Sequence, residues 1–215
     1  MKSTRRVALA GGSLLLATTV LGAGLTAGSA GADLDRRAGG TDVQAKLHPL
    51  NDSAVRGHAM VESSGRHLDI RLSARGLAKN LPHAQHIHYG EQARHECPTF
   101  KNDSNGDFRL NVAEGVPDYG PIAVSLTESG DTSPASGLAV DRFPTAPNGK
   151  VSYDRTARTQ RAVARAIRNG EGVVVVHGVD YNKNGHYDFD SAGASELNDD
   201  VPAEATDPAA CGVLK

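Results

Sequence analysis

The chain has 215 residues and a formal net charge of −2, and it contains no tryptophan and only 4% aromatic residues. This length favours a single domain, and the composition predicts a core of valine, leucine, isoleucine and alanine. The slightly acidic balance argues against nucleic acid as a partner, because proteins that bind it carry a basic surface.

Residues 1–32 are typical of a secretory signal peptide. Basic residues precede an apolar stretch at 7–25, and small residues at 30–32 provide a cleavage site. The basic residues are Lys2, Arg5 and Arg6. Cleavage there predicts a secreted, extracytoplasmic protein with no stable membrane span. Because the removed segment carries three positive charges, the formal net charge changes from −2 to −5. The alternative is a membrane anchor, and the glycines of the segment argue against it.

The segment at 33–41 is predicted to be a flexible leader, and residues 42–215 are predicted to form the folded domain. Runs rich in β-branched residues, separated by turns, predict strands at 43–47, 55–62, 67–73, 122–127, 151–153 and 172–177. The four consecutive valines before His177 suit a strand that is covered on both faces. The pattern indicates a mainly antiparallel β-sandwich or barrel.

One helix is predicted at 156–169, because this segment lacks glycine and proline and places apolar side chains on a narrow stripe. Its basic residues fall largely on the other side. They are Arg155, Arg158, Arg161, Arg165 and Arg168. These arginines form either a solvated helix face or a patch that steers anions or touches a membrane.

The only two cysteines, Cys97 and Cys211, both lie in the exported part of the chain. An oxidising environment favours their pairing, and two free buried thiols are the alternative. A disulfide between them would close a loop across most of the domain. The chain-entropy model gives such a loop about 4 to 5 kcal/mol of stabilisation.

Two histidines, His86 and His88, are spaced so that an extended strand projects both side chains from one face, while Ile87 points to the other. Two imidazoles on one face suggest a borderline transition metal such as copper or zinc. The alternative is a pair of hydrogen-bonded surface histidines.

Two segments rich in Asp, Asn and Gly match a calcium-loop template. The first, 103–114, has Phe108 where the template has glycine at position 6. The second, 180–191, has Gly185 there but Ser191 in place of the carboxylate at position 12, for which Asp190 is a substitute. The candidate calcium ligands are Asp103, Asn105, Asp107, Asn111 and Glu114 in the first loop and Asp180, Asn182, Asn184 and Asp188 in the second. Ordinary turns without metal are the alternative for both loops.

Several of these features occur together in an order that resembles the secreted copper/zinc superoxide dismutase superfamily. They are the run His83-Ala-Gln-His86-Ile-His88-Tyr-Gly90, Cys97, the strand end Val174-Val-Val-His177 and the segment Ala210-Cys211-Gly-Val213. The resemblance covers about residues 43–213. It implies a Greek-key antiparallel β-sandwich or barrel of the superoxide dismutase-like type, with one short helix and long loops.

The resemblance also implies roles for individual residues. His86, His88 and His177 match copper ligands and would be the catalytic residues. His83 matches a histidine that braces the copper site through a hydrogen bond, and the two cysteines match the family disulfide. Three neutral imidazoles can hold both Cu(I) and Cu(II), so a redox cycle at such a site is chemically sensible.

The chain departs from the family at three places. Asp103 stands where the family has a histidine that bridges copper and zinc, no histidine occurs between His95 and His177, and Pro208 replaces an arginine that attracts superoxide. A zinc site of the family type is therefore not expected. His58, His95 and Asp103 are candidates for a fourth copper ligand if the fold brings them close.

Two functions remain open from the sequence. One is a copper-dependent superoxide dismutase, acting on superoxide or another small molecule. The other is a non-catalytic extracytoplasmic binding module, either metal-binding or similar to chordin-type domains, which resemble the superfamily around the histidine run. A purely structural role for the histidines is a third interpretation. The sequence leaves the oligomeric state open.

Overall fold

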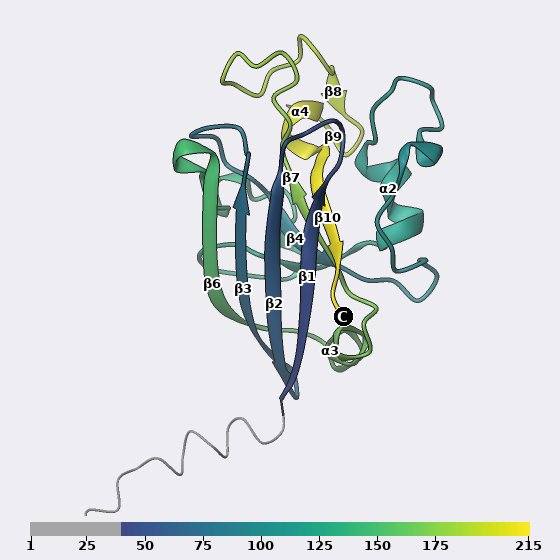
Figure 1. Cartoon of the computed structure of the whole chain (residues 1–215), viewed down its shortest axis with the longest axis vertical. Helices are drawn as coiled ribbons and strands as arrows, with labels where there is room; N and C mark the ends of the chain where they lie inside the picture. The colour runs from purple at the N-terminus through teal and green to yellow at the C-terminus, as the bar shows by residue number, and fades with distance from the viewer. Residues whose placement is uncertain (1–39) are drawn as a thin grey trace, which may run out of the picture.

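The computed structural model describes residues 40–215, so the predicted signal peptide and most of the predicted leader lie outside the described residues. Eight strands form one antiparallel sheet that curves into a nearly closed barrel (Figure 1). The predicted class, a mainly β antiparallel sandwich or barrel, is confirmed. Within residues 40–215, no helix is both long enough and apolar enough to cross a membrane.

The order of strands in the sheet follows the hydrogen-bonded neighbours. It is β5 (Ile122–Ser125), β4 (Gln85–His88), β7 (Val173–His177), β10 (Pro208–Val213), β1 (Thr41–Pro49), β2 (Arg56–Ser64), β3 (His67–Arg75) and β6 (Lys150–Arg158). A separate ribbon pairs β8 (Ala194–Ser195) with β9 (Asn198–Pro202). The α-helices are α2 (Val112–Tyr119), α3 (Arg161–Arg168) and α4 (Ala203–Thr206). Single 3-10 turns occupy Phe100–Asn102, Pro134–Ser136, Val140–Arg142 and Pro147–Gly149.

The core lies inside the barrel, where alternate residues of β1, β2, β3 and β6 are buried. Strand β7 is buried on both faces, as its four valines predict. Val174 and Val176 point into the barrel core, whereas Val173 and Val175 join Tyr119 in a second apolar cluster outside the sheet. This outer cluster forms because the segment that carries α2 covers the outside of β7.

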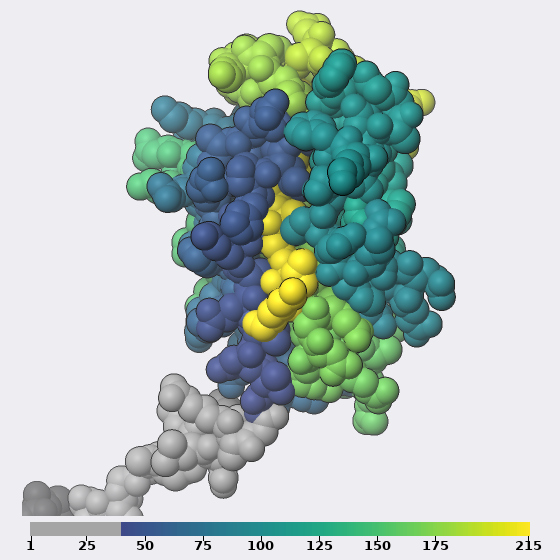
Figure 2. Space-filling view, turned by 45° about the vertical axis from the view of Figure 1, so that its right-hand side comes forward, coloured from purple at the N-terminus to yellow at the C-terminus, as the bar shows by residue number. Residues whose placement is uncertain are grey.

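The disulfide predicted between Cys97 and Cys211 is confirmed, with the two Cα atoms 5.7 Å apart. It ties the segment that carries α2 to β10, which pairs directly with β7. Figure 2 shows β10 in yellow at the floor of a furrow between β1 and the teal segment of α2. The bond therefore fixes the cover over the outer face of β4 and β7.

The helix expected at 156–169 begins only at Arg161, and Thr156 to Arg158 continue β6 instead. The reason is tertiary, because these three residues pair with His67 to Asp69 of β3. The structure has three short α-helices among its described residues and not the single one expected. Helix α2 begins inside the first calcium-like segment, with Asn111 as its N-cap.

Candidate metal centre

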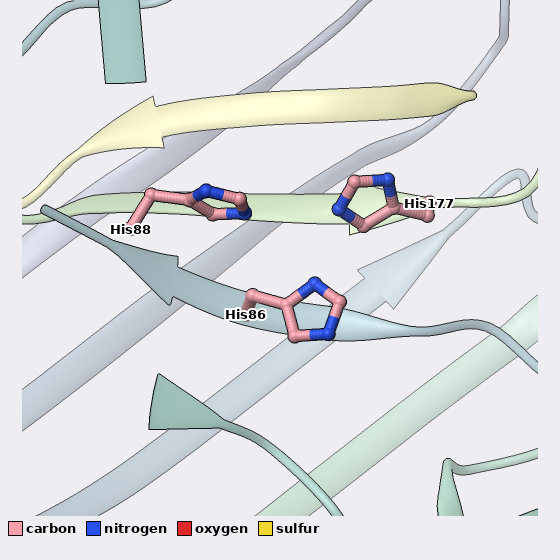
Figure 3. A group of neighbouring side chains, drawn as sticks. All are labelled: His86, His88 and His177. Atoms are coloured by element: carbon pink, nitrogen blue, oxygen red, sulfur yellow. The ribbon is translucent and has the colours of Figure 1, made fainter. Parts of the chain in front are cut away.

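Three histidines from two adjacent strands meet on the outer face of the sheet. His86 lies opposite Val175 and His88 opposite Val173 in the register of β4 with β7, and His177 ends β7. Each ring offers one nitrogen, and these three nitrogens lie within 4.8 Å of one another. Figure 3 shows the rings grouped above the two strands, His86 and His88 from β4 and His177 from β7. The buried cluster could hold a metal ion.

All three rings are shielded from solvent, with exposed fractions of 3% for His86, 1% for His88 and 3% for His177. Two aromatic side chains pack against them. The ring centroid of Tyr119, at the end of α2, lies 4.4 Å from the ring centroid of His88. The ring centroid of Phe143 lies 5.3 Å from that of His86. The centre is therefore enclosed between the sheet and its covering loops.

One nitrogen of each ring donates a hydrogen bond to a backbone carbonyl oxygen. The distances are 3.2 Å from His86 Nε2 to Gly137, 2.8 Å from His88 Nδ1 to Gly120 and 2.6 Å from His177 Nδ1 to Thr206. A carbonyl oxygen can only accept, so each of these nitrogens carries the proton. The backbone thus fixes the tautomer of every ring.

The remaining nitrogens are His86 Nδ1, His88 Nε2 and His177 Nε2, and each is buried without a hydrogen-bond partner among residues 40–215. In the fixed tautomers each of them carries a lone pair. Buried polar atoms are normally paired, and three lone pairs that face one another are unfavourable unless a cation lies between them. The donor set therefore fits a positively charged ion.

Burial also keeps the three imidazoles neutral. It lowers the pKa of His88 to about 3 and that of His177 to about 4, and it holds the pKa of His86 well below its ordinary value. The neighbouring histidines lower the pKa of His86 and His88 further, because two imidazolium charges repel each other. At neutral pH the cluster is a set of three neutral nitrogen ligands, which suits a borderline transition metal.

His83 lies beside the centre but outside the ligand group. It is fully buried, and its Nδ1 lies 2.8 Å from the carbonyl oxygen of His177. Its Nε2 lies 3.0 Å from the carbonyl oxygen of Ala78. A neutral imidazole has one N–H, so the ring donates to one of these two carbonyl oxygens, and the shorter distance favours that of His177.

The three candidates for a fourth metal ligand are not members of the histidine cluster. Among the described residues the ligand group holds only the three histidines, without His58, His95 or Asp103. The Nε2 of His95 donates to the carbonyl oxygen of Gly90, at 2.8 Å. Pro208 lies opposite His177 in the sheet, so this position supplies no cationic side chain.

The first calcium-like loop folds around its own backbone. Asp103 accepts hydrogen bonds from the N–H groups of Gly106 and Phe108. Phe108 adopts a φ of 62°, which provides the left-handed turn that glycine provides in the template. The carboxylate of Glu114 accepts from the N–H groups of Ser104, at 2.8 Å, and Asn111, at 3.1 Å. These donors stand at template positions 2 and 9.

A carboxylate from outside the second loop bonds to the backbone of that loop, and the sequence pattern did not reveal it. Glu204 of α4 is fully buried and accepts from the N–H groups of Tyr181, at 2.9 Å, and Asp188, at 3.0 Å. These are again positions 2 and 9, so Glu204 takes the place in this loop that Glu114 takes in the first. Asp190, the substitute considered from the sequence, is exposed. The one sequence signal for a carboxylate from elsewhere was Ser191, whose short side chain at position 12 lacks the carboxylate of the template.

The calcium candidates do not converge as the histidines do. Among residues 40–215 the loop carboxylates form no group of three ligands comparable to the histidine cluster. Instead, the remaining candidates bond locally: Asp107 accepts from the N–H of Arg109, and the amides of Asn182 and Asn184 face Asp188. Asp180 accepts from the N–H of Gly185 at 2.9 Å.

The fold and the site together define a class: an antiparallel β-barrel-like protein with one disulfide and a buried three-histidine cluster suited to a metal ion. A scan against protein-family models and a search of curated proteins found no match for the chain. The function is therefore argued from the geometry of the site and from the residues that build it.

Proposed function

We propose that the protein is an exported, superoxide dismutase-like protein that binds copper through His86, His88 and His177. The observation that carries this proposal is the set of three buried, unpartnered nitrogens within 4.8 Å of one another. Copper suits three neutral imidazoles, and the order of the histidine and cysteine motifs favours it over other borderline metals. When bound, copper would supply a one-electron redox couple that can alternately oxidise and reduce superoxide.

The chain's own residues prepare the site for that chemistry. The carbonyls of Gly137, Gly120 and Thr206 hold the three rings in the tautomers that present a lone pair to the ion. Burial excludes competing water and protons from the ligand nitrogens. Since Pro208 replaces the cationic side chain of the family, no guidance of the superoxide anion comes from this position, and we expect slower encounter than in an enzyme that has it.

The copper site is tested by electron paramagnetic resonance of the Cu(II)-loaded protein. We expect nitrogen coupling that disappears in the triple variant His86→Ala, His88→Ala, His177→Ala. The matched control changes three exposed histidines, His48→Ala, His58→Ala and His67→Ala. The control spectrum should equal that of the unmodified protein. If the buried triple variant keeps the same spectrum, copper binds elsewhere and the proposed centre is wrong.

The enzymatic part is tested separately, by measuring the consumption of superoxide at full copper occupancy. A rate well above that of the triple variant supports a dismutase. Full occupancy with no activity above background would leave the alternative function, a non-catalytic extracytoplasmic binding module. The two experiments together therefore separate copper binding from catalysis.

We further propose that calcium stabilises the two Asx-rich loops. The supporting observation is that Glu114 and Glu204 accept hydrogen bonds from the same two template positions in the two loops. Calcium should then raise the melting temperature, and Asp103→Ala or Asp180→Ala should reduce that rise. An unchanged melting curve on addition of calcium would make both loops ordinary turns.

A further inference from the structure

Five arginines surround two adjoining hollows at the end of the barrel where β1 begins, which we call the basic groove. The larger hollow, of about 450 Å³, is lined by all five arginines together with Ser64, Gly65 and His67. The smaller, of about 250 Å³, shares two of the arginines with it. The five are Arg66, Arg158, Arg161, Arg165 and Arg168. Helix α3, which carries three of them, lies at this end in Figure 1.

The fold assembles the basic groove from three separate elements. Arg66 belongs to the turn between β2 and β3, Arg158 ends β6, and the other three arginines follow one another at helical spacing along one side of α3. Two of the side chains are held in place. The Nε of Arg66 donates to the carbonyl oxygen of Thr159 at 2.8 Å, and Nη1 of Arg168 donates to Oγ of Ser63 at 2.9 Å. The remaining guanidinium donors stay available.

No carboxylate lines either hollow, and within the described part of the chain none of the five arginines forms an ion pair. This arrangement opposes folding. Arg161 and Arg165 repel each other one helical turn apart, and Arg161 stands in the first turn of α3, where the helix dipole disfavours a positive charge. An anion in the groove would relieve both effects.

The size and surroundings of the groove indicate the kind of anion. Arg161 and Arg168 are separated by about 10 Å along the helix axis, which is more than one phosphate group can contact. A lipid surface fits less well, because the exposed large hydrophobic side chains of residues 40–215 all lie outside the linings of the two hollows. Guanidinium groups bind phosphate oxygens in pairs. We propose that the basic groove binds the phosphate groups of an extended anionic polymer.

The proposal is independent of the metal centre. None of the three histidines lines either hollow, although Tyr89 of the smaller hollow follows His88 in the chain and Ile122 pairs with His88 in the sheet. Binding of a polymer at the groove should therefore persist in the triple histidine variant. It should also weaken as the salt concentration rises, because charged contacts between exposed groups are screened.

The test is a titration of the exported protein with inorganic polyphosphate. The variant Arg161→Gln, Arg165→Gln should bind about 30-fold more weakly, and it should melt no lower than the unmodified protein because it relieves a repulsion. The matched control, Arg56→Gln with Arg75→Gln, removes the same charge from an exposed pair that faces across β2 and β3 at the other end of these strands. The control should bind as the unmodified protein does.

Three outcomes would overturn the proposal. Equal weakening in both variants would mean that only the overall charge matters. Equal affinity for single phosphate ions and for polyphosphate, at the same phosphate concentration, would mean a site for one small anion. Tighter binding to vesicles of acidic phospholipid than to polyphosphate, lost in the groove variant, would identify a membrane surface as the partner.

Discussion

The ring of His83 and the backbone carbonyl of His177 lie 2.8 Å apart, although 94 residues separate them in the chain. His177 is both the last residue of β7 and the only member of the histidine cluster that is not on β4. Its N–H donates to the carbonyl oxygen of Ala84 at 2.8 Å and its ring donates to the carbonyl oxygen of Thr206, so hydrogen bonds hold both its backbone and its side chain. His83 therefore contacts the backbone of a cluster histidine and is not itself a member of the cluster.

Replacing His83 should loosen the metal centre and leave its ligands intact. In His83→Ala the buried carbonyl of His177 loses its partner, which costs about 1 to 3 kcal/mol of the free energy of unfolding. Loss of such a supporting contact typically weakens metal affinity by about 10- to 100-fold. Copper titration against a competing chelator measures the affinity, and urea unfolding measures the stability.

A spectroscopic control distinguishes positioning from ligation by His83. The nitrogen coupling of bound Cu(II) should remain in His83→Ala, because His86, His88 and His177 are unchanged. His83→Gln retains an N–H donor and should recover part of the lost affinity. Unchanged copper affinity in His83→Ala would contradict the positioning role.

The metal-free protein should lose stability in mild acid. The unfolded histidines take up protons near the ordinary pKa of 6.5, whereas the folded pKa is about 3 for His88 and about 4 for His177. Between these values the unfolded state binds more protons, so the free energy of unfolding is fully present above pH 6.5 and falls as the pH drops toward about 4. Each unit of pKa difference corresponds to about 1.4 kcal/mol.

This pH dependence is measured by urea unfolding at a series of pH values. A triple variant in which His86, His88 and His177 become Gln should show a much flatter profile over the same range. Asp207 contributes a slope of the opposite sign, because burial raises its pKa to about 6, but it is common to both proteins. Parallel profiles for the two proteins would show that the buried histidines are not responsible.

Local patterns in the sequence predicted the parts of the fold that depend on neighbouring residues. The alternation of buried and exposed residues in β3 and the shared face of His86 and His88 follow from strand geometry alone. The limits of β6 could not be predicted in this way. Thr156 to Arg158 have an ordinary helical composition, and only their pairing with β3 makes them a strand.

The candidate site also depends on contacts between distant segments, which local sequence patterns do not predict. The approach of His177 to His86 and His88 was expected only from a family resemblance, since no local pattern links residues on two strands. Glu204 enters the second Asx-rich loop from α4, a helix of four residues with no sequence signal of its own. The disulfide was predictable because the chain offers only one pair of cysteines.

Removing the disulfide should destabilise the protein and open the metal centre. Cys97 and Cys211 are 114 residues apart in the chain, and the chain-entropy model gives a loop of this length about 4 to 5 kcal/mol. The double variant Cys97→Ser, Cys211→Ser should therefore melt at a lower temperature. Because the bond anchors the segment whose Tyr119 packs on His88, copper should also pass to a chelator faster.

The matched control for this variant is the unmodified protein under a reductant that cleaves the bond, which should behave in the same way. Faster copper loss at a temperature well below melting would show that the effect is local. If the variant melts lower but releases copper at the unchanged rate, the cover over the centre does not depend on the disulfide.

The position of Glu204 makes a specific prediction about calcium in the second loop. Glu204→Gln keeps the size of the side chain but removes its charge, so the rise in melting temperature caused by calcium should shrink. Glu114→Gln should have a similar effect through the first loop. Even without calcium, each variant should lose about 1 to 3 kcal/mol, because backbone N–H donors face the substituted group.

Asp190→Asn is the matched control, since Asp190 is an exposed carboxylate in the same segment and directly precedes position 12. It should leave the calcium effect unchanged. The reverse result, a calcium effect lost in Asp190→Asn and kept in Glu204→Gln, would assign the missing carboxylate to Asp190. Because Thr206 of α4 accepts the hydrogen bond from His177, Glu204→Gln should also release copper faster than the Asp190 variant does. Equal copper release from the two variants would mean that the loop and the metal centre are not coupled through this helix.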